Sequence, residues 1–522
     1  MSARTGGECL LGVDIGTSGC KVALFTLDGE TVARAGEGYA VSRPRPGFAE
    51  QDADDWWAAV CRGVRRLLAE SGAAPADIAG VGVAGQSWAA LPVDRAGRAL
   101  RPAIIWLDRR AERQCQTLRE RIGEAALFAV SGNPLSPGYT TAKILWLQAE
   151  EPEVLRRTGA FLQSNSYIVR RLTGVNAQDV SQGYGIHAFD IARREWNREL
   201  CRELGLDPAW LPDICECDRI VGGVTEEAAR ATGLLAGTPV AAGGLDAACA
   251  ALGVGAVRPG EAQEQGGQAG GMSIALDRPV RHERLILGCH AAAGMWLLQG
   301  GTTGGGSLRW FARQFAASQG ATAAPEEAAL LAALDAEAQR APPGANGLVF
   351  LPYMAGERSP VWDSRARGVW LGLTYETDRG RMARAIMEGC AFALRHNLQT
   401  AAEAGADARV LHSMGGAANS GVWMQIKADV TRRRLRAAAT GDATALGAAL
   451  LAGIGTGAYR SAPDAVLRAV RFRGGCEPVS GVRSTYDRLY AAYLETYRRL
   501  RDVFPLLDDP TTPDDWKASE CE

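Results

Sequence analysis

The chain has 522 residues, of which 47% are hydrophobic and 22% are charged, and its formal net charge is −2. This composition is typical of a globular protein with about two to four domains. The near-neutral charge excludes the basic field that nucleic-acid binding requires, and no apolar run approaches the roughly 18 residues of a membrane span, so we expect neither nucleic acid nor membrane as a partner.

The cysteines and the N-terminal residues indicate a cytoplasmic protein. The 12 cysteines are scattered, mostly within apolar runs, as expected of buried thiols. Met1–Glu8 lack the apolar core of a signal peptide. Cys215 and Cys217 are the only close pair, and without a second pair or nearby histidines they form a weak zinc motif.

The first motif is a short apolar run that ends in an acid and a glycine turn. Leu10–Val13 leads into Asp14-Ile-Gly-Thr-Ser-Gly-Cys-Lys21, and apolar residues resume at Val22. Walker and Rossmann phosphate loops lead into a helix, whereas Asp28-Gly29 closes this run after about five residues, so strand–turn–strand is predicted. A carboxylate beside such a turn suits a metal–nucleotide site, and an ordinary hairpin with a polar tip is the alternative.

The next segment is expected to contain a core helix and a glycine-rich strand. The helix begins near Asp52 or Asp54, and its apolar stripe predicts core packing. Gly80, Gly82 and Gly85 have the Gly-x-Gly-x-x-Gly spacing but lie within an apolar strand, with no helix opening at the third glycine. They are therefore predicted to admit a neighbouring layer rather than a dinucleotide.

Two strands are predicted to end in polar and aromatic side chains. One ends in Gln86-Ser87-Trp88 and the other in Trp106-Leu-Asp108-Arg109-Arg110. Ligands bind at the carboxyl ends of strands in open α/β sheets, and Trp, Asp and Arg suit a sugar. A surface ion pair is the alternative for Asp108.

Further along, the pattern predicts helices over 141–173, a polar segment of strands or loops over a cleft at 177–190, and a helix over 196–206. A strand beginning at Pro239 then ends at Gly243-Gly244, and Asp246 opens an Ala-rich helix. Because a helix N-terminus favours an ionised carboxylate, Asp246 is either an N-cap or a catalytic base.

The second half repeats the first motif. Glu261–Leu276 is predicted to form strand–glycine turn–strand, and Asp14 and Asp246 are 246 − 14 = 232 residues apart. The repetition indicates a duplicated domain with a cleft between the copies. A glycine-rich run at 300–307 is expected before a helix, and strands are expected at 348–354 and 410–414. Asp442–Leu450 is expected to form a small-residue helix that packs under a bound ring.

Together these motifs resemble the FGGY carbohydrate kinases, most closely the xylulokinase-like branch, over about Leu10–Tyr459. The matching segments are Asp14–Lys21, Glu50-Gln51-Asp52 with Trp56-Trp57, Gly85-Gln86, Trp106–Arg110, Gly243–Asp246, Gly356–Pro360, Gly415-Gly416 with Asn419-Ser420, and Gly441–Ala449.

The resemblance implies an α/β fold of two actin-like (ribonuclease H-like) ATPase domains with a cleft between them. The N-terminal kinase domain would span 8–253, the C-terminal nucleotide-binding domain 254–500, and an acidic tail 501–522. ATP and Mg²⁺ would be required. The acceptor would be a small sugar or polyol, and the likeness to the xylulokinase branch favours a pentulose.

The resemblance also implies roles for individual residues. Asp246 would be the general base, and Asp14 would be catalytic and lie near Mg²⁺ through water. The other residues implied in binding are Gln86, Ser87, Trp88, Trp106, Asp108 and Asp246 for the sugar, and Thr17, Ser18, Lys21, Gly267, Gln268, Gly415, Gly416 and Asn419 for ATP.

The sequence departs from the family pattern at two sites. Family members usually have Ser-x-Gly-Thr-Ser in the second phosphate loop, where this chain has Gln265, Gly267, Gln268 and Ala269. Xylulokinase-like members often have Met-His where this chain has Ser87-Trp88. The alternatives to a kinase are a catalytically weak sugar- or nucleotide-binding regulator and an ATPase without a sugar acceptor. The resemblance also allows a homodimer.

Overall fold

The computed structural model of the chain describes residues 8–316 and 327–507, so most of the predicted acidic tail lies outside the described residues. The chain forms two compact units. The first contains the described residues up to Pro259 together with Ala275–Leu298 and Asp442–Arg471, and the second contains Gly260–Ile274, Gln299–Gly441 and the residues from Phe472 onward. Each unit is built around a large sheet.

The first sheet has the strand order β13-β14-β5-β1-β2-β3, with β15 also pairing with β5. Its strands are β1 (Cys9–Ile15), β2 (Gly19–Thr26), β3 (Thr31–Gly38), β5 (Ile78–Gly85), β13 (Ile220–Gly223), β14 (Pro239–Ala241) and β15 (Gly244–Leu245). β1 and β2 form the predicted hairpin, since they pair antiparallel from Cys9 opposite Thr26 to Ile15 opposite Cys20. β5 is parallel to β1, β14 and β15, and the carboxyl ends of β1, β5 and β15 lie near one another.

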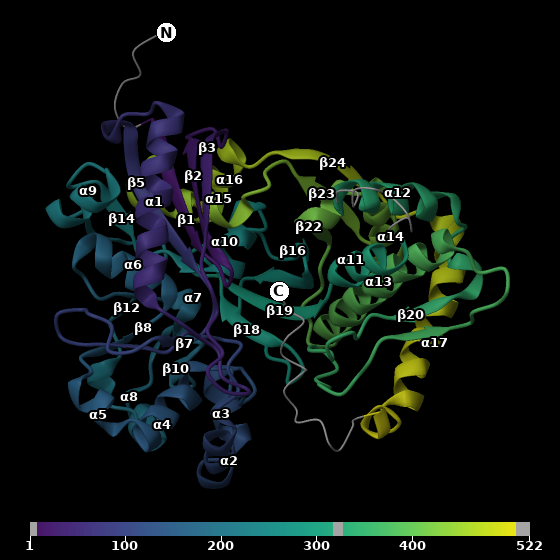
Figure 1. The fold of residues 1–522 in the computed structure, drawn as a ribbon, viewed down its shortest axis with the longest axis horizontal. Coiled ribbons are helices and arrows are strands. Elements are labelled where there is room, and N and C mark those ends of the chain that lie inside the picture. The colour runs from purple at the N-terminus through teal and green to yellow at the C-terminus, as the bar shows by residue number, and fades with distance from the viewer. Residues whose placement is uncertain (1–7, 317–326, 508–522) are drawn as a thin grey trace. The chain divides into compact units, whose positions relative to one another are not determined.

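Helices cover both faces of this sheet (Figure 1). On one face lies α1 (Ala53–Ser71), which Asp52 caps by accepting a hydrogen bond from the Asp54 amide. Its Trp56, Val60 and Leu67 are buried in the same cluster as the alternate β1 residues, as the apolar stripe predicted. On the other face lies α15 (Ala443–Gly455), which packs on β1, β5 and α10 (Asp246–Gly253).

The glycines of β1 and β5 let α15 approach the sheet closely. A Cβ on Gly12 would lie 1.9 Å from the Ala445 carbonyl oxygen, and a Cβ on Gly82 would lie 1.8 Å from the Ala448 carbonyl oxygen. The prediction that these glycines admit a neighbouring layer is therefore confirmed. The small-residue helix is also confirmed, but it packs on this sheet, where its alanines face glycines.

Shorter elements complete the first unit. The helices are α2 (Glu112–Arg121), α3 (Glu124–Ser131), α4 (Thr140–Glu150), α5 (Pro152–Arg157), α6 (Ser164–Thr173), α7 (Val180–Gly183), α8 (Arg198–Leu204), α9 (Glu226–Thr232) and α16 (Ala462–Ala469). The paired short strands are β4 (Glu50–Gln51) with β7 (Ala103–Ile104), β6 (Leu91–Val93) with β8 (Ala160–Leu162), β9 (Gln178–Asp179) with β12 (Ile214–Cys215), and β10 (Phe189–Asp190) with β11 (Glu195–Trp196).

Two predictions for this region need correction. The stretch expected to be helical over 141–173 contains the strand β8, whose apolar residues are buried against β6. The segment at 177–190, expected over a cleft, is almost wholly buried, and its polar side chains are held by internal hydrogen bonds.

The second sheet repeats the first. Its strands are β16 (Glu261–Gly266), β17 (Ala269–Leu276), β18 (Ile286–Cys289), β19 (Trp296–Thr303), β22 (Val410–Met414), β23 (Arg434–Ala438) and β24 (Phe472–Cys476). The order β19-β17-β16-β22-β23-β24 corresponds to β3-β2-β1-β5-β14-β13 in the first sheet, and β18 lies beside β19. In both sheets an antiparallel hairpin is followed by two parallel pairings and one antiparallel pairing. The predicted hairpin at Glu261–Leu276 is confirmed.

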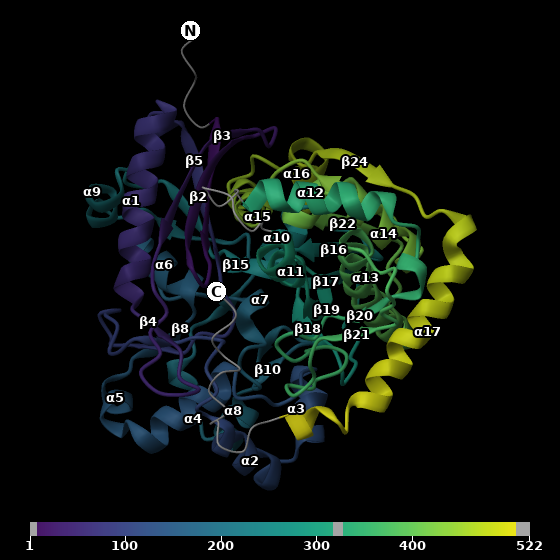
Figure 2. The ribbon, with the colours of Figure 1, turned by 45° about the vertical axis from the view of Figure 1, so that its right-hand side comes forward.

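The second unit has its own apolar core. Its helices are α11 (Gly306–Phe311), α12 (Glu327–Arg340), α13 (Arg379–Glu403), α14 (Gly421–Thr431) and α17 (Arg483–Leu500), and β20 (Val349–Leu351) pairs with β21 (Val369–Leu371). The long yellow helix α17 in Figure 2 packs on α14 and β20. Within the described ranges, no helix combines the length and hydropathy needed to cross a membrane.

Candidate active site

Three neighbouring parallel strands of the first unit end in site residues. Asp14 is opposite Ala84 in the pairing of β1 with β5, and Leu245 of β15 is opposite Gly85. Gln86 follows β5 directly, and Asp246 follows β15 as the first residue of α10. The sheet therefore brings Asp14, Gln86 and Asp246 to one edge, which is where open α/β sheets bind ligands.

Asp14 and Asp246 are carboxylates in a desolvated environment. The pKa of Asp14 is raised to about 7, chiefly by burial and also by the charges of Asp246 and Asp442, while Lys21 acts to lower it. Burial raises the pKa of Asp246 to about 6, against the lowering effect of the Ala247 amide, which donates to Asp246 Oδ1 at 2.6 Å. Asp14 Oδ1 is buried and has no hydrogen-bond partner within the described residues. A buried, unpaired carboxylate oxygen suits a cation.

The turn between β1 and β2 is held from outside by two side chains. The Gly16 amide donates to the Gly19 carbonyl at 3.0 Å, which closes the turn. Tyr39 Oη donates to the Gly16 carbonyl at 2.7 Å, and Gln51 Nε2 donates to the Thr17 carbonyl at 2.6 Å. Ser18 and Lys21, both predicted to bind ATP, are exposed on this hairpin. The turn is thus a fixed loop with an exposed tip.

A network of polar side chains joins this turn to the end of β5. Gln86 Nε2 donates to Gln51 Oε1 at 2.7 Å, and Trp106 Nε1 donates to Thr17 Oγ1 at 3.0 Å. Thr17 Oγ1 donates to Gln86 Oε1 at 3.4 Å. Four side chains thus meet: Thr17, Gln51, Gln86 and Trp106. Roles were predicted for three of them, and none was predicted for Gln51. Its only signal was the Glu50-Gln51-Asp52 motif.

Trp88 belongs to an aromatic cluster beside Gln86 and the half-buried Ser87. Its ring stacks on Tyr139 with 4.2 Å between centroids, and Tyr184 and His187 pack edge-on against this pair. The backbone of Trp88 is left-handed, with φ of 55°. Trp88 Nε1 and Tyr139 Oη are buried without a hydrogen-bond partner in the part of the chain that is described. These donors are available to a polar ligand.

A buried lysine holds the backbone of this aromatic cluster through two hydrogen bonds. Lys143 Nζ donates to the Trp88 carbonyl at 2.8 Å and to the Gly138 carbonyl at 2.7 Å. Burial lowers the pKa of Lys143 to about 7. No sequence motif indicated Tyr139, Lys143 or His187, because each lies far from Trp88 along the chain.

Asp108 lies in a buried ion pair. Its carboxylate accepts hydrogen bonds from the Ala49 amide at 2.6 Å and from Arg110 Nη2 at 2.7 Å. Arg110 also pairs with Glu50 at 2.7 Å, and its guanidinium lies over the Phe48 ring. The structure therefore shows the ion pair that was the alternative for Asp108, but the pair is buried and does not lie at the surface.

The predicted nucleotide-binding residues of the second unit gather at the corresponding edge of its sheet. The Gly305 amide donates to the Gly267 carbonyl at 2.7 Å, and the Gly306 amide donates to the Gln268 carbonyl at 3.0 Å, so a second glycine segment supports the β16–β17 turn. Gly415, with φ of 82°, packs against the same turn, since a Cβ there would lie 2.8 Å from the Gly266 carbonyl oxygen. The loop that follows β22 exposes Gly415, Gly416 and Asn419.

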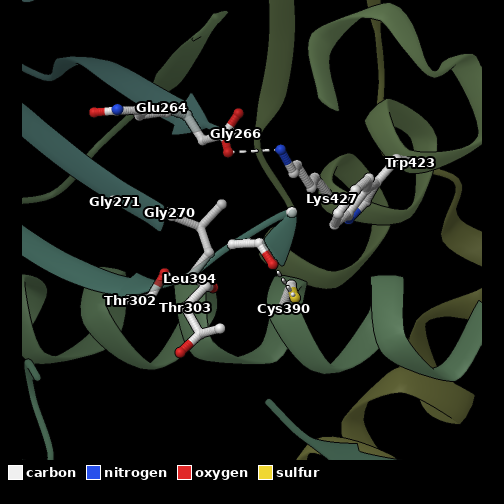
Figure 3. A pocket seen from close by; sticks show the side chains of 13 residues that line it. Glu264, Gly266, Gly270, Gly271, Thr302, Thr303, Cys390, Leu394, Trp423 and Lys427 are labelled. Carbon is white, nitrogen blue, oxygen red and sulfur yellow. Dashed lines mark hydrogen bonds and ion pairs between the residues drawn. The ribbon is translucent and has the colours of Figure 1, made fainter. Parts of the chain in front are cut away.

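A small cavity lies beneath this turn (Figure 3). Lys427 Nζ pairs with Glu264 Oε1 at 2.6 Å, and Ser413 Oγ also donates to this carboxylate. Trp423 and Cys390 line the cavity, and burial raises the pKa of the Cys390 thiol to about 12. The buried ion pair anchors β16 to α14 under the turn.

The described residues contain no group of three or more His, Cys, Asp or Glu side chains arranged to hold a metal ion by themselves. Cys215 and Cys217 are buried, and the Cys217 thiol donates to Asp179 Oδ1 at 3.8 Å.

Comparisons with known proteins match nearly the whole chain. The N-terminal domain of the FGGY family of carbohydrate kinases matches residues 9–253, and the C-terminal domain matches residues 271–456. Xylulose kinase from Escherichia coli is 34% identical over 507 residues, which cover 95% of this chain and 99% of that protein. Xylulose kinase from Bacillus subtilis is 31% identical over 502 residues, or 95% of this chain and 97% of that protein.

The solved structures agree with the sequence relatives. The crystal structure of xylulose kinase from Rhodospirillum rubrum has a TM-score of 0.86 at 32% identity and covers 95% of this chain and 100% of its own. The two-domain, actin-like α/β fold is thereby confirmed. The chain belongs to the FGGY family of carbohydrate kinases, enzymes that phosphorylate sugars with ATP.

Proposed function

We propose that this kinase phosphorylates a hydroxyl of a pentulose, with D-xylulose as the first candidate. The observation that carries the proposal is the meeting of Asp14, Gln86 and Asp246 at the ends of three neighbouring parallel strands. The relatives at 31% and 34% identity are named xylulose kinases, which supports the choice of sugar.

In this proposal Asp246 is the general base. Its pKa of about 6 leaves it ionised at neutral pH and close enough to that pH to accept a proton efficiently. It takes the proton of the attacking hydroxyl as that oxygen bonds to the γ-phosphorus of ATP, while the bond from this phosphorus to the bridging oxygen breaks and ADP leaves. The helix dipole of α10 favours the ionised form before the proton arrives.

Gln86, Ser87, Trp88 and Trp106 are proposed to hold the sugar. The Trp88 indole offers a flat apolar surface and an unpartnered N–H, which suit a sugar's carbon face and a hydroxyl. We do not extend this role to Asp108, because its fully buried carboxylate is neutralised by an ion pair with Arg110. For Asp108 we propose instead that it holds the loop after Trp106 in place.

ATP is proposed to bind two similar turns, the β1–β2 turn and the β16–β17 turn. Thr17, Ser18 and Lys21 on the first turn would contact the transferred phosphate, since the tip is exposed and its backbone is fixed. The first turn belongs to the proposed domain at 8–253, and the second turn belongs to the proposed domain at 254–500. The second turn and the loop after β22 would hold ATP through Gly267, Gln268, Gly415, Gly416 and Asn419.

The residues at Asp14 fit Mg²⁺. The unpaired, buried Asp14 Oδ1 and the nearby Asp246 and Asp442 concentrate negative charge, and Mg²⁺ in kinases uses one or two carboxylates with waters and phosphates. When bound, the ion would neutralise charge that develops on the phosphates. Asp14 would hold it, through water.

The proposal is tested by measuring ADP release with Mg-ATP against a panel of pentuloses, hexuloses, polyols and glycerol. We expect a strong response to a pentulose, and a response to another sugar alone would refute the choice of pentulose. A catalytically silent regulator would bind ATP and release no ADP with any sugar.

A further inference from the structure

A buried polar turn between β9 and α7 connects two of the strand ends that carry the candidate site. The turn runs from Gln178 to Gly183, and the exposed fractions of Asp179, Ser181 and Gln182 are 1%, 0% and 1%. Buried polar side chains are retained where each finds a hydrogen-bond partner. The partners here lead to Leu245 and Gln86.

Asp179 is the centre of the turn. Its Oδ1 accepts hydrogen bonds from Ser181 Oγ at 2.5 Å and from the Gln182 amide at 3.0 Å. Its Oδ2 accepts from Asn165 Nδ2 at 2.9 Å. The Cys217 thiol and Gln178 Nε2 add longer hydrogen bonds, at 3.8 and 3.4 Å. In the described part of the chain these neutral donors, and no cation, satisfy the carboxylate. Such a buried charge is costly unless the donors are fixed, so the turn and α6 form one rigid element.

Ser181 passes this rigidity to the residue before Asp246. Its Oγ accepts a hydrogen bond from the Leu245 amide at 2.8 Å, and its hydroxyl donates a hydrogen bond to Asp179 Oδ1. A hydroxyl that donates to a carboxylate is polarised and therefore a better acceptor. A Cβ on Gly244 would lie 3.0 Å from Ser181 Oγ, so a larger residue at this position would push against the serine. α7 accordingly lies against β15 (Figure 2).

Gln182 makes the matching connection to Gln86. Its Nε2 donates to the Gln86 carbonyl at 3.0 Å and to the Gly85 carbonyl at 3.2 Å. Ser164 Oγ, on the neighbouring helix, donates to the same Gln86 carbonyl at 3.1 Å. The turn therefore holds the backbone at both Leu245 and Gln86.

We propose that Asp179 and Ser181 are positioning residues for phosphoryl transfer, which fix the backbone of Leu245 through Ser181 and that of Gln86 through Gln182, so that Asp246 and Gln86 share one acceptor hydroxyl. The inference rests on the proposed roles of Asp246 and Gln86. Asp179 and Ser181 are buried, and they act through hydrogen bonds to the main-chain amides of Gln182 and Leu245. A displacement of about 1 Å at a reacting group can reduce turnover by about 100-fold.

The first test removes the connection to Leu245. We expect Ser181→Ala to lower kcat at least about tenfold while the KM for ATP stays within about twofold, because only the acceptor side is disturbed. Ser131→Ala is the matched control: Ser131 is another fully buried serine of the first unit, and its Oγ bonds Leu127 and Asn133 away from the site. This control should retain wild-type kcat.

The second test exchanges the two partners of the central hydrogen bond. In Asp179→Asn the new amide would face the Asn165 amide, so two donors meet and kcat should fall at least about tenfold. The double variant Asp179→Asn with Asn165→Asp restores one donor and one acceptor with the same net charge. We expect kcat of the double variant to return to within about threefold of wild type.

Hydrogen exchange supplies a readout that does not depend on activity. The Leu245 amide should exchange faster in Ser181→Ala than in wild type and Ser131→Ala. The inference would be overturned if folded Ser181→Ala had wild-type kcat or if its Leu245 amide exchanged at the wild-type rate. It would also be overturned if the double variant Asp179→Asn with Asn165→Asp regained wild-type stability but not kcat. If Asp179→Asn does not fold, Ser181→Ala decides. A wild-type enzyme without sugar-dependent turnover would refute the proposed function instead, and Leu245 exchange would then decide the positioning role alone.

Discussion

The substitution Gly82→Ala tests whether the close packing of α15 supports the strand that carries Gln86. The new Cβ would lie 1.8 Å from the Ala448 carbonyl oxygen and 2.5 Å from its carbon. Gly82 has no positive φ, so alanine fits its backbone and any destabilisation comes from the contact alone. Carbon–oxygen contacts across packed elements are about 3.3 Å or longer, so α15 must withdraw by about 1.5 Å.

Such a withdrawal would also disturb the contacts on either side. A Cβ on Gly447 would lie 1.8 Å from the Cys249 carbonyl oxygen, so α15 is as tightly packed on α10 as on the sheet. Overpacking commonly costs about 1–3 kcal/mol. Because the clash here is with backbone that cannot rotate away, we expect Gly82→Ala to lower the free energy of unfolding of the first unit by about 3 kcal/mol or more.

The assay is hydrogen exchange followed by mass spectrometry on peptides from 78–85 and 443–455. Both peptides should lose protection, while peptides from 410–431 in the second unit keep theirs. Gly80→Ala is the control on the same strand, because its Cβ would meet the Ala452 and Thr456 side chains at 3.2 and 3.3 Å and should cost less than about 1.5 kcal/mol. Equal protection in the two variants would refute the reasoning.

Three further predictions concern catalysis and the buried ion pair. Because a base must be ionised and the pKa of Asp246 is about 6, kcat should rise with pH through an ionisation near 6; initial rates that stay constant from pH 5 to 8 would count against it. Asp14→Asn should lower kcat by about 100-fold and raise the Mg²⁺ concentration needed for half-maximal rate, and an unchanged Mg²⁺ titration would exclude its role. Arg110→Met should destabilise the first unit by about 3–5 kcal/mol because it leaves the buried Asp108 carboxylate without its cation. The denaturant midpoint measures this loss, and adding Asp108→Asn should recover part of it.

Local patterns in the sequence predicted the elements that do not depend on distant residues. Asp14 was identified because it stands between an apolar strand and a glycine turn, and Asp246 because it follows a strand with a glycine pair and opens a helix; both lie at strand ends as expected. The two hairpins were predicted for the same reason, since the short run after the glycine turn left no room for a helix. The glycines of β5 were correctly separated from a dinucleotide motif.

Contacts between distant segments were beyond the reach of local patterns. The helix at 443–455 follows more than 350 residues after β5 in the chain, yet packs on it, and no periodicity indicates that partner. Asp108 and Arg110 have the same residue types whether they bind sugar or each other, so only their burial separates the two alternatives. Asp179 and Ser181 were assigned no role because a polar, glycine-containing stretch indicated strands or loops over a cleft, whereas here it fills the interior.

The central claim is that Asp246 removes a proton from a sugar hydroxyl that then accepts a phosphoryl group from ATP. The most direct measurement is detection of phosphorylated D-xylulose by phosphorus NMR, with wild type and Asp246→Asn incubated in parallel with Mg-ATP. The account predicts sugar phosphate and an equal amount of ADP with wild type. It predicts that Asp246→Asn still binds Mg-ATP but forms product at least about 100-fold more slowly. Product formation at a near-normal rate by the variant would contradict it.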